Sequence, residues 1–261
     1  MTVRVESQGR VLVVTIDRPE RRNAVDQLAA RLLLEAFEEF AHDSTHDVAV
    51  LTGANGTFCA GADLKAISEG TGNRVTADGP GPMGPTRLLL DKPVIAAVEG
   101  FAVAGGFELA LWCDLRVMAS DAVMGVFCRR WGVPLVDGGT IRLPRLVGSS
   151  RAADMILTGR EVGAEEAVGM GLANRVAEPG HALSDAIALA NQLASLPQTC
   201  LRSDLRSSKE QWGLEVDHAL RREYELGMAT VESGETLRGA TRFANGAGRH
   251  GTSAPVGDLT E

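Results

Sequence analysis

The sequence predicts an α/β protein that becomes helical toward its C-terminus, and three observations lead to this fold class. Over the first half of the chain, short β-branched and apolar runs alternate with segments of helical period. Beyond about residue 137 the apolar patterns are mostly helical. With 44% hydrophobic and 23% charged residues, the 261-residue chain can bury a sizeable core, which excludes a disordered or collagen-like protein.

The individual elements follow from residue type and spacing. Residues 3–6 and 11–16 flank a turn at Gln8–Gly9, and this pattern predicts a β-hairpin. Asp26 is expected to be the N-cap of the first helix. That helix is expected to bury a residue every four positions: Leu28, Leu32, Ala36 and Phe40. Further strands are predicted at 48–52, 93–98, 115–118 and 123–127, and further helices at 105–113, 149–157, 164–169, 182–196, 199–212 and 215–231.

Glycine is unusually frequent, at 30 of 261 residues, against an average of roughly 7% in proteins. Residues 70–85 alone hold five glycines and three prolines, so they predict a long loop without regular structure. A flexible surface loop and a lid over a binding site both fit this composition.

Charge and cysteine usage exclude several function classes. The net charge is −8 and basic residues form no cluster, so a nucleic-acid partner is not expected. The N-terminus is polar and no apolar run is long enough to span a bilayer, so a membrane partner is not expected either. The four cysteines are far apart in sequence, which predicts reduced thiols and a cytoplasmic protein. No cluster of residues suggests a metal site.

Two segments, residues 58–65 and 100–110, each run from a strand through small residues into a helix. Small residues expose backbone N–H groups at a helix N-terminus, where these groups lack intrahelical partners. If both termini meet in space, they form an oxyanion hole, and Glu108 lies one helical turn away. The alternative is that Gly105 and Gly106 only allow close packing and that Glu108 is a solvated first-turn carboxylate.

These segments are similar to motifs of the crotonase superfamily, also called the enoyl-CoA hydratase/isomerase superfamily. The matching segments occur in the family's order: residues 18–19, 23–25, 61–65, 92–100, 104–110, 114, 138–144, 157–160, 164–167 and 171–173. The resemblance implies a crotonase-like spiral of ββα turns with a helical C-terminal trimerisation region. On this basis we expect an acyl-CoA-binding core over residues 1–195 and a helical oligomerisation region with a frayed tail over residues 196–261. A homotrimer or a dimer of trimers (a hexamer) is the implied assembly.

The resemblance also assigns site residues. It implies that the backbone N–H groups of Ala62 and Gly105 form the oxyanion hole and polarise the carbonyl of an acyl-CoA thioester. Ala62, Asp63, Leu64 and Lys65, together with Gly105, are expected to bind the substrate, with Lys65 near the phosphates of coenzyme A. Coenzyme A is then part of the substrate, and no separate cofactor is expected. The neighbouring Arg21 and Arg22 are expected to be surface residues.

The sequence departs from the family at the second catalytic carboxylate. A hydratase of this family uses two glutamates; Glu108 matches the first, but Cys128 stands at the second position. A thiol replaces a carboxylate poorly as a proton carrier, so Cys128 is either an uncharged wall residue or a thiol activated by Arg129 and Arg130. Asp137 is a further candidate carboxylate, although an Asp before a helix is also a common N-cap.

The function expected from these features is enoyl-CoA hydratase, a lyase that adds water reversibly to 2-enoyl-CoA, as in fatty-acid β-oxidation. Loss of the second glutamate leaves other reactions open: double-bond isomerisation, decarboxylation or hydration of one unusual acyl group. A non-catalytic acyl-CoA-binding homologue is a third possibility, although the presence of Glu108 argues against it.

Overall fold

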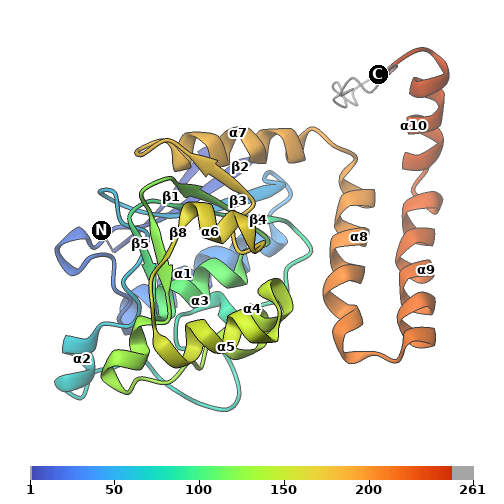
Figure 1. Ribbon diagram of the computed structural model, residues 1–261. Coiled ribbons are helices and arrows are strands. Elements are labelled where there is room, and N and C mark those ends of the chain that lie inside the picture. Colours follow the sequence, from blue (N-terminus) through green and yellow to red (C-terminus); the bar gives the residue numbers. More distant parts are fainter. Residues whose placement is uncertain (1, 249–261) are drawn as a thin grey trace.

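The computed structural model describes residues 2–248, and these form two sheets with helices on both sides (Figure 1). The larger sheet has six strands in the order β1-β2-β3-β4-β6-β9. Its only antiparallel pair among the described residues is the N-terminal hairpin β1–β2. The strand bounds are β1 Val3–Gln8, β2 Val11–Ile16, β3 Val48–Gly53, β4 Val94–Val98, β6 Leu115–Ala119 and β9 Arg175–Ala177.

The smaller sheet contains three short strands in the order β5-β7-β8. Their bounds are β5 Phe101–Val103, β7 Val123–Gly125 and β8 Val162–Gly163. The chain therefore advances in ββα turns, since β4, β5 and α3 (Gly105–Trp112) follow one another directly, and β6 and β7 lead to α4 (Gly139–Val147). The turn before them runs from β3 through Cys59, which bridges to β5, into α2 (Leu64–Ser68).

The large sheet is covered on both faces. Helix α7 (Ala182–Ala194) packs on β3, β4 and β6, while α1 (Gln27–His42) contacts β1 and β2 on the opposite side (Figure 1). Strands β2 to β4 are buried almost throughout, as expected for parallel strands between two helical layers. The remaining helices of the core are α5 Ser149–Thr158 and α6 Ala164–Gly169.

The first helix begins as predicted but buries a different face. Asp26 is its N-cap and accepts a hydrogen bond from the N–H of Ala29. Leu28 is 46% exposed, so its predicted burial is wrong. The buried residues follow the i, i+3, i+4 pattern of a 3.6-residue period rather than a strict spacing of four: Ala29, Leu33, Ala36, Phe37 and Phe40.

Two further differences concern elements that were predicted with other bounds or not predicted at all. The strand predicted at 123–127 ends at Gly125, because residues 127–131 form a 3-10 turn. Strands β5, β8 and β9 and the last helix, α10 (Glu235–Ala244), were not predicted from the sequence. The frayed tail predicted at the end of residues 196–261 lies mostly outside the described residues.

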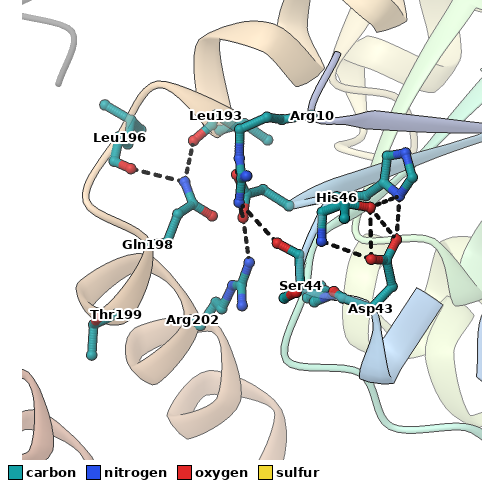
Figure 2. Close-up of polar contacts among 12 residues, drawn as sticks. Arg10, Asp43, Ser44, His46, Leu193, Leu196, Gln198, Thr199 and Arg202 are labelled. Atoms are coloured by element: carbon teal, nitrogen blue, oxygen red, sulfur yellow. Dashed lines mark hydrogen bonds and ion pairs between the residues drawn. The ribbon is translucent and has the colours of Figure 1, made fainter. Parts of the chain in front are cut away.

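The C-terminal helices α8 (Gln198–Glu210), α9 (Val216–Glu232) and α10 stand beside the rest of the chain, with α8 nearest to it (Figure 1). Polar side chains hold α8 in place: Arg202 donates to the buried carboxylate of Asp47 at 2.6 Å, and Arg10 donates to the same group at 2.7 Å (Figure 2). Near its other end, Lys209 pairs with Asp114 at 2.6 Å. Across the described part of the chain, no helix combines the length and apolar character needed to cross a membrane.

Candidate active site

The register of two neighbouring ββα turns determines where the site forms. Cys59 pairs with Ala102 in a parallel bridge, supported by hydrogen bonds from Cys59 N to Phe101 O at 2.9 Å and from Val103 N to Cys59 O at 3.0 Å. Ala62 lies three residues after Cys59, and Gly105 lies three residues after Ala102. The two chains leave the bridge together, so these two residues reach the same region of the molecule.

Unusual backbone conformations orient the two amides. Gly61, with φ +100°, precedes the N–H of Ala62, and Ala104, with φ +54°, precedes the N–H of Gly105. A Cβ on Gly61 would lie 2.8 Å from the Cβ of Ala104 and 2.9 Å from Gly105 N, so the turns touch and only glycine fits. Positive φ at Ala104 costs on the order of 1–3 kcal/mol, which the surrounding contacts must offset.

Neither amide is used by the fold itself. Within the described residues, the N–H groups of Ala62 and Gly105 donate no backbone or side-chain hydrogen bond. The first segment differs here from the sequence prediction, because the N-terminus of α2 does not offer its own amides. Asp63 is the N-cap of α2 and accepts from the N–H groups of Lys65 and Ala66.

Glu108 lies in the first turn of α3 and is only 2% exposed, so it is not a solvated carboxylate. Its Oε1 accepts hydrogen bonds from the N–H of Asp137 at 3.0 Å and from the N–H of Gly139 at 2.7 Å. Burial raises the pKa of Glu108 to about 7, and the negative charge of Asp137 adds to this effect. A carboxyl with this pKa exists in both protonation states near neutral pH, which suits it for accepting and returning a proton.

These groups surround one cavity of about 720 Å³ with a largely apolar wall. Of the residues predicted for the site, Ala62, Leu64, Gly105, Glu108, Cys128 and Asp137 line this cavity. The structure therefore brings together side chains and amides from three successive ββα turns.

Two predicted substrate-binding residues do not line the cavity. Asp63 is occupied as the N-cap of α2 and pairs with Arg18 at 3.1 Å. Lys65 points to solvent, with a side chain that is 60% exposed, and its Nζ lies 3.9 Å from Glu69. Lys65 can therefore contact only the part of a ligand that extends beyond the cavity.

Cys128 is a buried wall residue of the cavity. Burial raises the pKa of its thiol, and the charge of Glu108 raises it further. The two neighbouring arginines point elsewhere, since Arg129 donates to Ile156 O at 3.1 Å and Arg130 donates to Gly159 O at 3.0 Å. The thiol is thus neutral near pH 7, and activation by these arginines is not what the structure shows.

Asp137 is buried and is not a helix N-cap, which corrects the alternative drawn from sequence. Gly138 occupies the position before α4. The Asp137 carboxylate instead accepts hydrogen bonds from Met83 N, at 2.9 Å, and from the hydroxyl of Thr86. Both donors belong to the glycine-rich loop and its end, so this loop is tied to the wall of the cavity.

Several cavity residues were not predicted for the site, and Arg22, Met83 and Trp131 are three of them. Arg22 is exposed, as expected, and also contributes to the cavity lining from a left-handed turn with φ +50°. Met83 of the loop lies against Gly105, where an added Cβ would be 2.7 Å from its Sδ. Trp131 follows the Cys128 position in sequence and is 71% exposed at the cavity wall. The composition of residues 70–85 indicated a possible lid, but not which side chain would enter the site.

The stacked ββα turns are matched by solved structures named as enoyl-CoA hydratases, and they define the fold class as that of the crotonase superfamily. The family model for enoyl-CoA hydratase/isomerase matches residues 6–247, so the chain belongs to that family.

Individual relatives support the assignment. The chain is 34% identical over 247 residues to enoyl-CoA hydratase EchA19 of Mycobacterium tuberculosis, and the match covers 92% of each chain. It is 37% identical over 250 residues to a carnitinyl-CoA dehydratase of Salmonella arizonae, covering 93% of this chain and 95% of that one. Among solved structures, enoyl-CoA hydratase EchA1 from Mycobacterium marinum matches with a TM-score of 0.89 at 38% identity, over 94% of this chain and 96% of that chain.

Proposed function

We propose that the protein is a hydro-lyase of enoyl-CoA hydratase type, which adds water reversibly to a 2-enoyl-CoA, as in fatty-acid β-oxidation. The observation that carries the proposal is the placement of two free amides, of Ala62 and Gly105, around the same cavity as the buried carboxyl of Glu108. Two relatives support it: one is named as a hydratase and one as a dehydratase, enzymes that add water to a double bond or remove it.

In the proposed reaction the thioester carbonyl accepts hydrogen bonds from both amides. Glu108, as a carboxylate, takes a proton from water while the water oxygen bonds to the β-carbon. The electron pair of the double bond moves to the thioester oxygen, and the two N–H groups stabilise the resulting enolate. The protonated Glu108 then returns its proton to the α-carbon, which regenerates the carbonyl and leaves a 3-hydroxyacyl-CoA. One carboxyl group with a pKa near 7 can perform both transfers.

A second candidate reaction is double-bond isomerisation, and the neutral thiol of Cys128 favours it. Moving a double bond requires one group that shuttles a proton between two carbons of the acyl chain, whereas hydration also requires a bound water to be activated. A cavity with one buried, hydrogen-bonded carboxyl and a neutral thiol can meet the requirement for a single proton shuttle. Decarboxylation, hydration of one unusual acyl group and non-catalytic acyl-CoA binding stay open for the same reason.

A panel assay tests the proposal and separates these reactions. Purified protein is incubated with short- and long-chain 2-enoyl-CoA, 3-enoyl-CoA and malonyl-type CoA esters, and products are separated by mass and retention time. We expect 3-hydroxyacyl-CoA from 2-enoyl-CoA, with a loss of about 10²–10⁴-fold in Glu108→Gln. Glu38→Gln, a change of an exposed glutamate on α1, is the matched control. Unchanged turnover in Glu108→Gln, or binding without any turnover, would overturn the hydratase assignment.

We propose that coenzyme A arrives as part of the substrate and that no separate cofactor takes part, because the amides and Glu108 supply both polarisation and proton transfer. We also propose that the protein acts in the cytoplasm. Its four cysteines support this, since all are free thiols and three of them are buried.

We propose that residues 196–261 form an oligomerisation region and that the assembly is a homotrimer or a dimer of trimers. Large apolar side chains that the described residues leave exposed on and around α9 and α10 support this: Trp212, Leu214, Val216, Leu220, Tyr224, Val231, Leu237 and Phe243. Sedimentation equilibrium tests it, with a mass three or six times that of the chain expected and a monomer as the contrary result.

A further inference from the structure

We propose that Asp137 is a positioning residue, which fixes the end of the glycine-rich loop against the cavity through its side chain and orients Glu108 through its backbone N–H. The inference rests on the proposed function, because it assigns a role within the same site. The alternative role for Asp137 is that of a second proton carrier, and the experiments below distinguish the two roles.

Several hydrogen bonds join Asp137 to the end of the glycine-rich loop. Its Oδ1 accepts from Met83 N at 2.9 Å and from the Thr86 hydroxyl. Arg142 reinforces the same junction, donating to Asp137 O at 2.8 Å and to Thr86 O at 2.6 Å. The loop is thus fastened to the start of α4 by two side chains from that segment.

This junction also fixes the position of Met83 beside Gly105, the proposed oxyanion donor. Met83 is 1% exposed, and its side chain packs against Gly105 so closely that a Cβ there would be 2.7 Å from Sδ. Gly81 is equally confined, since an added Cβ would be 2.7 Å from Asp137 Oδ1. A shift of the loop would therefore move the wall that borders the Gly105 amide.

Asp137 also contacts Glu108 directly, through its backbone N–H. The N–H of Asp137 donates to Glu108 Oε1 at 3.0 Å, so the peptide that carries the loop contact also sets the orientation of the reactive carboxyl. Asp137 Oδ1 is already the acceptor for two donors and has to stay an acceptor to hold the loop. An asparagine oxygen can make the same two contacts, whereas it cannot exchange a proton.

Asp137→Asn against Asp137→Ala gives the sharpest test. The positioning role predicts that Asn lowers kcat for enoyl-CoA hydration by less than about tenfold, while Ala lowers it by on the order of a hundredfold. Glu108→Gln, measured alongside, should lose about 10²–10⁴-fold. If Asn loses as much as Glu108→Gln, Asp137 is a proton carrier; if Ala changes neither kcat nor KM, it has no role, and either result overturns the inference.

Thr86→Val and Thr86→Ser keep the test decisive if Asp137→Ala does not fold. Thr86 is 1% exposed and does not line the cavity, so we expect its side chain to affect turnover through the junction with Asp137. Val removes the donated hydrogen bond and Ser retains it. We expect kcat to fall several-fold in Val and to be restored in Ser, with KM for the acyl-CoA changing less. Equal kcat values in the two variants would contradict the role of this contact.

A pH profile adds a readout that a purely structural residue would not move. The ionisable groups that face Glu108 are Asp137, Cys128 and Arg142. Asp137→Asn removes the negative charge that disfavours ionisation of Glu108, so the acid-side midpoint of kcat/KM should move to lower pH. Thr86→Val keeps the Asp137 carboxyl but removes a hydrogen bond that lowers the pKa of that group, so the midpoint should move less than in Asp137→Asn. If Glu108→Gln itself retains full turnover, the proposed function fails, and this outcome is distinct from each of those above.

Discussion

Replacing Glu108 by Gln should stabilise the protein at alkaline pH, even though it removes the group expected to transfer protons. The carboxyl is 2% exposed, and burial raises its pKa from 4.5 to about 7. Glutamine has the same shape and keeps an oxygen that can accept from the N–H groups of Asp137 and Gly139. The substitution thus removes a buried ionisation with little change in packing.

The magnitude follows from linkage between proton binding and folding. The pKa rises by about 2.5 units between the unfolded and the folded chain, and each unit corresponds to roughly 1.36 kcal/mol, which gives about 3 kcal/mol. The folded state holds the Glu108 proton more tightly, so its contribution to stability is complete below pH 4.5 and is lost as the pH rises through about 7. Wild type should therefore lose about 3 kcal/mol relative to Glu108→Gln across this window.

Urea unfolding of both proteins at pH 4.5 and at about pH 8, at one fixed protein concentration, measures this difference. The fixed concentration matters because an oligomer's apparent stability depends on it. We expect similar unfolding free energies at the lower pH and an advantage of about 3 kcal/mol for the variant at the higher pH. A variant-minus-wild-type difference that changes by less than about 1 kcal/mol between the two conditions would refute the reasoning.

Three further predictions concern activity and the attachment of α8. The kcat/KM of wild type should fall below about pH 7, because protonated Glu108 cannot accept a proton from water, and a flat profile from about pH 5 to 8 would contradict this. Cys128→Ser should lower kcat by less than about tenfold, since the buried thiol is a neutral wall residue, and a larger loss in steady-state assays would show that the thiol takes part. Asp47→Ala should lower the free energy of unfolding by about 1–3 kcal/mol, because Arg10 and Arg202 lose their shared partner, whereas exposed Asp185→Ala should not; equal urea midpoints for the two variants would be the contrary result.

The long elements were predictable from sequence because their cause is local. β-Branched runs and helical periodicity placed β2, β3 and β4 and helices α1, α5 and α6 within one or two residues. The short strands β5, β8 and β9 were missed because each has only two or three residues, and pairing across the small or large sheet creates them. The predicted burial of Leu28 was wrong for a similar reason, because its exposure depends on which face of α1 packs on the sheet.

The site was predictable in part for a related reason. Small residues between a strand and a helix indicated residues 58–65 and 100–110, and the resemblance to the crotonase superfamily assigned the two amides to Ala62 and Gly105. Asp63 was expected to bind substrate, but it is the N-cap of α2, a common role for an Asp before a helix. At Asp137 the N-cap interpretation was the one considered, and there it failed. Its partners Met83 and Thr86 lie more than fifty residues earlier, and no local pattern connects them to it.

In the proposed function, the backbone and the side chains of the cavity have separate tasks. The two free amides depend on strand register and on positive φ at Gly61 and Ala104, so most side-chain substitutions leave them in place. Three cavity side chains lie on later segments: Glu108, the proposed proton carrier, and Cys128 and Asp137. A substitution at any one of them leaves this register in place. A chain that lacks the second glutamate can therefore keep its means of stabilising an enolate. The variants at Glu108, Cys128 and Asp137 measure which of these side chains carries protons to that enolate in the proposed reaction.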